Sequence, residues 1–254
     1  MAYRYLFEQM VRRELRQKYR GSALGVLWYL INPLVLMGAY YLMFGVIFNQ
    51  TSEPDYPLFL LIGLVVWVFF NQAVVSAAPS LLDQGALVRK ARFPREIIPA
   101  SVVTVQLVTF LALLALLAPV TIAIRGTVDV ALLLLPLVLA CLFAFVLGFA
   151  FVVSILHAYF RDVAPILSAA LLPWFFVSPI FFRPESITEQ ATARFVLEWV
   201  NPVAPFIGAT RDVIYGGVVP GVAELAYVVI VGALALLGGH ALFRRLQGEL
   251  AVVV

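Results

Sequence analysis

Six long apolar segments confine this sequence to folds that span a lipid bilayer. A helix needs roughly 20 apolar residues to cross about 30 Å of hydrocarbon, and most of these segments reach that length. Charged residues make up only 12% of the chain, whereas they make up roughly a quarter of an ordinary soluble domain. The apolar segments cover residues 26–48, 57–82, 101–124, 131–156, 166–182 and 222–243.

A chain in lipid must satisfy its backbone hydrogen bonds internally, which favours helices. The sequence therefore predicts an all-α polytopic membrane protein whose residues 1–254 form a single transmembrane domain. Residues 26–243 hold its six membrane helices, and residues 244–254 form a tail. The fifth segment has only 17 residues and contains Pro173 and Pro179, so we expect it to be tilted, broken or extended at one end.

The basic residues are distributed unevenly between the two sides that six spans would create. Counting along the chain places 13 of the 17 Lys and Arg residues on the side of the N-terminus. Cytoplasmic loops carry such an excess of Lys and Arg. Both termini are therefore predicted to be cytoplasmic.

Residues 1–22 combine a broad apolar side with a dense set of positive charges. This pattern is typical of a helix that lies in the bilayer surface rather than across it. Arg4, Glu14 and Lys18 intrude on the apolar side, so we expect part of it to meet protein. The basic residues of this predicted interface helix include Arg12, Arg13, Arg16, Lys18 and Arg20.

The segment 183–220 is half-apolar and allows two interpretations. As a seventh span it would bring Glu198, Arg211 and Asp212 into hydrocarbon, at a cost of several kcal/mol. We favour short re-entrant helices on the outer side, packed against the other spans, because irregular backbone at membrane depth needs protein or water around it.

The sequence argues against an enzyme. Its only lysines, Lys18 and Lys90, are followed by Tyr19 and Ala91, so the phosphate-binding pattern GxxxxGK[ST] is absent. His157, His240 and Cys141 form no metal-ligand pattern, and we expect no metal or cofactor in this chain. The basic residues lie beside spans, where retention on the cytoplasmic side and anionic lipid explain them more simply than nucleic acid does.

A basic loop with interleaved apolar residues lies between the second and third spans, at residues 83–99. The positive charges alone fit a solvated cytoplasmic loop. Leu87, Val88 and Phe93, however, also fit a short helix that inserts apolar side chains into a groove of a soluble partner. Both interpretations remain open from composition.

Aromatic and small polar residues recur on one side of several spans. Most such residues pack the core or lie at the membrane interface. Aromatic rings also stack on sugars, and hydroxyl or amide groups exchange hydrogen bonds with them. A conduit for a neutral or weakly charged polymer is therefore a second hypothesis, with the lining residues Tyr40, Tyr41, Phe44, Trp67, Asn71, Trp174, Ser178 and Phe181.

Four segments together resemble one known family over nearly the whole chain. They read RRELRQKYRGSALGVLWYLINPL, LVRKARFPREIIP, HAYFRDVAPILSAALLPWFFVSPIFF and NPVAPFIGATRDVIYGG. They resemble the permease subunit of ABC-2 type polysaccharide exporters, the O-antigen and teichoic-acid export family.

The resemblance implies a function and partners that the composition does not. It implies a homodimer in the bacterial cytoplasmic (inner) membrane, worked by two copies of a separate ABC ATPase that bind ATP and Mg, and a lipid-linked polysaccharide as substrate. The first and fifth spans would line the channel, with external gate helices within residues 185–217. The resemblance also implies an ATPase-coupling element formed by Arg89, Lys90, Arg92, Phe93, Pro94, Arg95 and Glu96.

Two alternatives share parts of this pattern. An ABC-2 exporter of a drug or lipid would have the same architecture with a smaller and more apolar cavity. A membrane anchor that recruits a cytoplasmic complex would use the basic N-terminus without transport.

Overall fold

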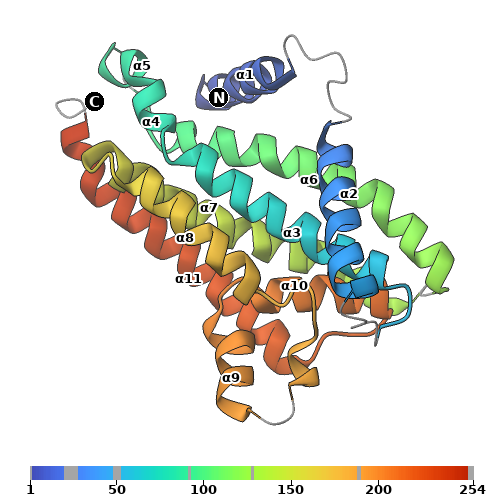
Figure 1. Ribbon diagram of the computed structural model, residues 1–254. Coiled ribbons are helices and arrows are strands. Elements are labelled where there is room, and N and C mark those ends of the chain that lie inside the picture. The colour runs from blue at the N-terminus through green and yellow to red at the C-terminus, as the bar shows by residue number, and fades with distance from the viewer. Residues whose placement is uncertain are drawn as a thin grey trace.

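Long helices packed side by side form the body of the protein in the computed structural model (Figure 1). The structure describes residues 2–19, 28–47, 53–90, 93–126, 129–187 and 190–250. Within this part, four helices are long and apolar enough to cross a membrane: α3 (Tyr56–Ala77), α6 (Ile97–Arg125), α7 (Leu135–Tyr159) with its leading 3-10 turn η3 (Val130–Leu134), and α11 (Val222–Leu246). The chain is therefore a multi-pass membrane protein.

Two shorter apolar helices correspond to the first and fifth predicted segments. α2 (Trp28–Tyr40) continues as the π-helical stretch η2 (Tyr41–Ile47). α8 (Val163–Val177) ends at Ser178, whose backbone is extended, with a ψ of 143°. A residue that precedes proline is disfavoured in helical conformation, so Pro179 accounts for this early end. All six predicted segments contain helix, four of them at full spanning length.

The hydrophobic core is built around α3. In the apolar 18-residue stretch of α3, 72% of the residues are buried within the protein, compared with 17% in the corresponding stretch of α11. The ring of Phe70 lies 5.7 Å from that of Phe145 on α7, and Phe69 stacks at 4.8 Å on Phe110 of α6. Such ring pairs add to the stabilisation that burial itself provides. α3 is the central helix and α11 a peripheral one.

Small residues bring α7 and α11 into backbone contact. A Cβ atom placed on Gly239 would lie 2.2 Å from the carbonyl oxygen of Gly148, and one on Gly148 would lie 2.1 Å from that of Ala235. Close approach through small residues is a common way for helices to associate in lipid, where the hydrophobic effect does not drive them together. α11 is therefore attached mainly through α7.

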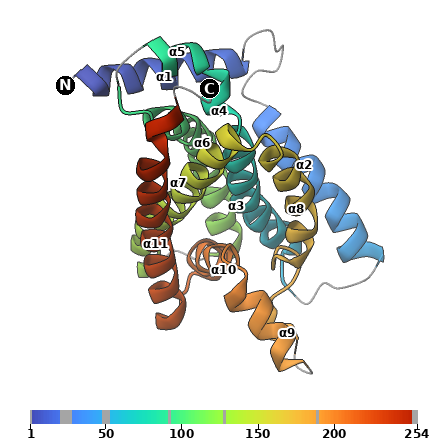
Figure 2. The ribbon, with the colours of Figure 1, turned by 90° about the vertical axis from the view of Figure 1, so that its left-hand side faces the viewer.

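One end of the bundle, the α1 end, collects the basic segments. α1 (Ala2–Tyr19) lies across this end against α6, with α4 (Ser80–Asp83), α5 (Gly85–Lys90) and the C-terminal end of α11 nearby (Figures 1 and 2). A second apolar cluster, which includes Met10, Leu81 and Phe243, joins these elements. The predicted interface helix thus packs on protein as well as presenting an exposed basic side.

The opposite end, the α9 end, holds a series of short helices instead of a seventh span. They are η4 (Pro184–Ser186), α9 (Ala191–Phe195), η5 (Val196–Val200), α10 (Ala204–Arg211) and η6 (Asp212–Gly216). α9 projects from the bundle, whereas α10 lies under it (Figure 2). α10 packs on α3 and α7, and Phe206, Ile207 and Thr210 are fully buried.

Candidate functional site

A groove of about 440 Å³ runs between α2, α3 and α8. The lining residues of each helix recur mostly at three or four positions, so they lie on one broad face of that helix. Asn32, Asn71, Gln72 and Ser168 are its polar residues. Tyr40, Trp67 and Phe175 are its aromatic residues, and the other lining side chains are aliphatic. The groove is thus amphipathic along its length.

The groove changes character along the bundle. Asn32 and Ser168 lie near the starts of α2 and α8, and Asn71 and Gln72 lie in the second half of α3, which runs the opposite way. These polar residues are therefore all toward the α1 end. Tyr40 and Phe175 lie toward the α9 end, where their ring centroids are 5.4 Å apart.

Seven of the eight residues predicted to line a conduit lie in or beside this groove. Tyr40, Trp67 and Asn71 line the groove itself. The rings of Phe44 and Phe181 both pack against that of Tyr40, and their own centroids are 4.6 Å apart. The Trp174 ring lies 6.2 Å from that of Trp67. Tyr41 is the exception: it is 37% exposed and its ring lies 6.4 Å from that of Tyr56.

Trp174 and Ser178 also connect α8 to the buried short helix α10, through hydrogen bonds to Asn201. The indole nitrogen of Trp174 donates to the Asn201 side-chain oxygen at 2.9 Å, and the Asn201 amide nitrogen donates to the Ser178 hydroxyl at 3.0 Å. The same Asn201 oxygen accepts from the backbone N–H of Val203 at 3.1 Å. Because Asn201 directly precedes the turn into α10, this chain of bonds joins the end of α8 to the start of α10.

Arg211 joins α10 to α3 and to the turn after α8. Its guanidinium donates to the backbone carbonyl of Phe59 at 3.1 Å and to those of Pro179 and Ile180, and it stacks 3.7 Å from the centre of the Phe59 ring. Only 4% of Arg211 is exposed. A buried guanidinium needs such partners, and Gly63 makes room for it, since a Cβ there would lie 2.2 Å from the guanidinium.

Salt bridges extend this connection across the α9 end. Arg183 pairs with Glu53 at 2.6 Å and with Asp212 at 3.7 Å. Arg125 pairs with Asp55 at 3.5 Å and lies over the Tyr215 ring, whose hydroxyl donates to the carbonyl of Pro54. The ends of α6, η6 and the segment before α3 are thereby tied together.

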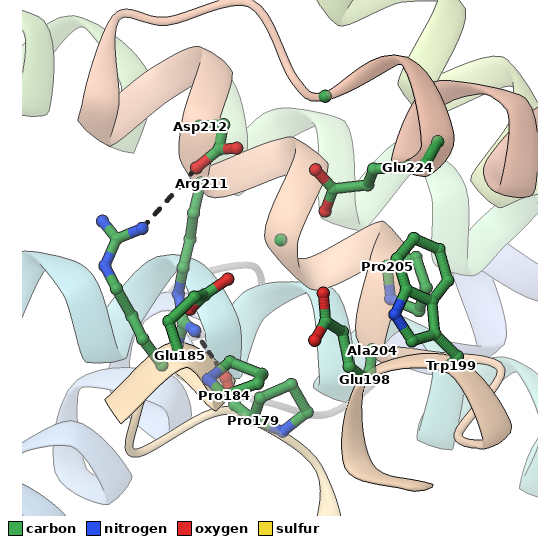
Figure 3. Close-up of a pocket in the computed structure, with 14 residues that line it drawn as sticks. Pro179, Pro184, Glu185, Glu198, Trp199, Ala204, Pro205, Arg211, Asp212 and Glu224 are labelled. Atoms are coloured by element: carbon green, nitrogen blue, oxygen red, sulfur yellow. Dashed lines mark hydrogen bonds and ion pairs between the residues drawn. The ribbon is translucent and has the colours of Figure 1, made fainter. Parts of the chain in front are cut away.

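An acidic cavity of about 290 Å³ lies beside these contacts (Figure 3). The carboxylates of Glu198 and Glu224 point into it, and Glu185 also lines it. Burial raises the pKa of Asp212, while the charge of Arg183 opposes that change. No group of three His, Cys, Asp or Glu side chains in the described part of the chain is arranged to hold a metal ion.

Polar contacts also link the elements of the α1 end. Gln84, which follows α4, accepts from Arg13 and donates to Glu14, both at 3.3 Å. The Lys18 ammonium donates to Gln106 of α6 at 2.5 Å, and burial lowers the Lys18 pKa to about 8. These residues line a polar cavity of about 580 Å³ between α1, α4 and α6.

The predicted coupling element lies at this end and is partly packed into it. Arg89 is exposed, whereas Phe93 packs against the apolar cluster of the α1 end. Arg95 donates to the carbonyl of Gln247, at the end of α11. Pro94 and Glu96 are half-buried. Arg20 and Arg92 lie outside the described residues, and so does the Lys90 side chain. Arg12, Arg13 and Arg16 are exposed on α1.

The structure thus combines a membrane bundle, a lateral amphipathic groove and a basic end, which are features of a membrane transport subunit. Residues 5–215 match the family described as ABC-2 type transporter, and the chain belongs to this family.

Curated relatives match over nearly the whole chain. It is 30% identical over 249 residues to the O-antigen export system permease protein RfbA of Myxococcus xanthus, covering 98% of this chain and 95% of the relative. It is 27% identical to an RfbA of Klebsiella pneumoniae, covering 98% and 96%. It is 26% identical to the polysialic acid transport protein KpsM of Escherichia coli, covering 93% and 92%.

Proposed function

We propose that this chain is the channel-forming permease of an exporter that moves a lipid-linked polysaccharide across the bacterial cytoplasmic membrane. The membership in the ABC-2 family and the names of the relatives support this function. Two copies of a separate ABC ATPase would bind ATP and Mg and supply the energy. The permease itself would break no covalent bond.

The observation that carries this proposal is how the basic α1 end is connected. Exposed arginines on α1 and Arg89 on α5 present positive charge for a soluble partner. Behind them, Gln84 links to α1, and Arg95 reaches the end of α11. A displacement of this surface by a partner would therefore be transmitted to several long helices at once. The α1 end therefore has the positive charges of a solvated loop and, in addition, fixed contacts with the helix bundle.

The membrane placement follows from the same charges. The α1 end, with both termini, would face the cytoplasm, since basic loops are retained there. α2 and α8 would complete a set of six spans with α3, α6, α7 and α11. The short helices from η4 to η6 would enter the outer leaflet and act as an external gate, because Arg211 and Asn201 satisfy polar groups that lipid would not.

A second copy of the chain would complete the conduit. The groove between α2, α3 and α8 is open on one side, and apolar side chains of α8 are exposed there: Leu172, which lines the groove, is 65% exposed, and Phe176, next to the lining residue Phe175, is 48% exposed. An exposed apolar surface beside a polar groove suits a symmetric helix interface around a channel.

The test is the effect of the permease on its ATPase. We expect the ATPase encoded beside this chain to co-purify with it and to hydrolyse ATP faster in its presence. Arg89→Glu should reduce this stimulation at least tenfold, because reversing an interface charge places like charges together. Arg194→Glu, a matched reversal at the α9 end, should leave it within twofold. Undiminished stimulation by the Arg89→Glu variant would refute the coupling role, and absence of any complex would refute the proposal.

A further inference from the structure

We propose that Asn32, Asn71 and Gln72 bind uncharged sugar units in the groove and thereby select a neutral polysaccharide over a polyanionic one. The inference rests on the proposed function and names the chemical class of its cargo. Three observations carry it: the unused hydrogen-bonding capacity of these amides, the charges of the groove, and the order of its polar and aromatic parts.

The three amide side chains have hydrogen-bonding capacity to spare. Within the described part of the chain, none of them makes a side-chain hydrogen bond, in contrast to Asn201, Gln84 and Gln106. A side-chain amide offers two donors and a carbonyl acceptor. The neighbouring Ser168 is also exposed in the groove. Polar groups inside a membrane bundle are costly and mark the path of a substrate.

The described residues that line the groove include no charged side chain. The ion pairs of Arg183, Arg125 and their carboxylates lie at the α9 end, and Lys18 contributes to a different cavity. A carboxylate on the polymer would lose water here without meeting a cation, which costs several kcal/mol per ion. A sugar hydroxyl would exchange water for an amide, which costs little.

The order of the lining fits a sugar chain that enters from the α1 end. The amides come first, followed by Trp67, and then by Tyr40 and Phe175 near the closed aromatic end. Amides can bind the hydroxyl edges of a sugar ring and aromatic side chains its C–H faces. Both contacts are individually weak, which allows a polymer to move on after it binds.

The experiment measures binding to the full-length permease in lipid nanodiscs by saturation-transfer NMR. The probes are maltoheptaose, which is neutral, and a sialic acid heptamer, which carries one carboxylate per residue. We expect wild-type protein to bind maltoheptaose at least tenfold more tightly than the sialic acid heptamer. Equal affinities, or no binding of either probe, would overturn the proposal.

Variants identify the amides as the cause. The pair Asn71→Ala with Gln72→Ala should weaken maltoheptaose binding about tenfold, which corresponds to about 1.4 kcal/mol. Gln190→Ala, an exposed residue outside the groove, is the control and should change nothing. Unchanged maltoheptaose binding after loss of both amides would overturn the assignment.

A further pair of variants separates binding from misfolding, because tighter binding of one probe can be observed only in folded protein. Gln72→Lys should raise affinity for the sialic acid heptamer at least tenfold, whereas Gln72→Glu, nearly the same size as the native residue, should abolish it. If Gln72→Lys leaves the preference as in wild type, residue 72 does not face the sugar.

The outcome is independent of the test of the exporter itself. Binding is measured without ATPase or nucleotide. A loss of selectivity would therefore overturn the groove assignment alone, and a failure of the Arg89→Glu experiment would overturn the coupling role alone.

Discussion

Two adjacent glycines of α11 should respond in opposite ways to the same substitution. Gly239 faces Gly148, and a Cβ there would lie 2.2 Å from a backbone oxygen and 2.8 Å from its carbon. A Cβ added to Gly238 would meet no atom within 4 Å. Alanine at 239 would force α11 away from α7 by about 0.8 Å to reach even a 3.0 Å contact.

The magnitudes follow from two known effects. Alanine stabilises a helix interior by about 1 kcal/mol relative to glycine, which applies at both positions. Inserting a carbon into a closely packed site costs about 1–3 kcal/mol, and here only Gly239 meets that cost, against backbone that cannot rotate away. Gly238→Ala should be neutral or stabilising. The propensity gain is common to both variants, so Gly239→Ala should be less stable than Gly238→Ala by about 1–3 kcal/mol.

Thermal unfolding in detergent, followed by tryptophan fluorescence, measures this difference. For a chain of this size, a difference of about 1–3 kcal/mol corresponds to roughly 2–12 °C between the two variants. Equal melting temperatures for Gly238→Ala and Gly239→Ala would refute the close packing of α7 against α11.

Three further predictions concern burial, pH and topology. Arg211→Met should lower the melting temperature, because three backbone carbonyls lose their donor at about 1–3 kcal/mol each, partly offset by the charge no longer buried. Arg194→Met should have little effect, and equal shifts would contradict the buried role. The unfolded chain keeps the Lys18 proton to about pH 10.5 and the folded chain releases it near 8. Wild type should therefore gain stability relative to Lys18→Met from pH 8 to 10.5; a falling difference would contradict the burial. In intact cells that express a cysteine-free version of the chain, an impermeant maleimide should label Thr192→Cys at the α9 end and not Ala86→Cys at the α1 end. The reverse pattern would refute the proposal that the α1 end faces the cytoplasm.

Much of the fold follows from the sequence because membrane helices leave a local signal. The apolar segments predicted where helices lie, and prolines account for where two of them end. α3 stops at Ala77, two residues before Pro79, and α8 stops before Pro179. The half-apolar segment after α8 forms short helices, as the cost of its charged residues in lipid indicated.

The groove was only half predictable. Trp67 and Asn71 were recognisable through their spacing along one helix, and Tyr40 through its place beside an aromatic stripe on another. Asn32, Gln72 and Ser168 were not, because three separate helices bring them together, and no local pattern reports such packing. The unassigned polar residues inside apolar segments were the one available signal.

The buried position of Arg211 could not be predicted from the sequence. By sequence it counted as an external charge, whereas it is buried under the bundle. Its acceptors are carbonyls of Phe59, Pro179 and Ile180, and backbone carbonyls occur at every position. The Gly63 that makes room for it is likewise recognisable only once the two segments are seen together.

Reconstituted transport tests whether the permease and its ATPase together move a polysaccharide. Permease and its neighbouring ATPase would be reconstituted into liposomes that contain a lipid-linked polysaccharide, and its movement across the bilayer followed with an impermeant lectin. We expect movement that requires both proteins and ATP and that stops in the Arg89→Glu variant. Movement by the permease without the ATPase, or none with both and ATP, would contradict this expectation.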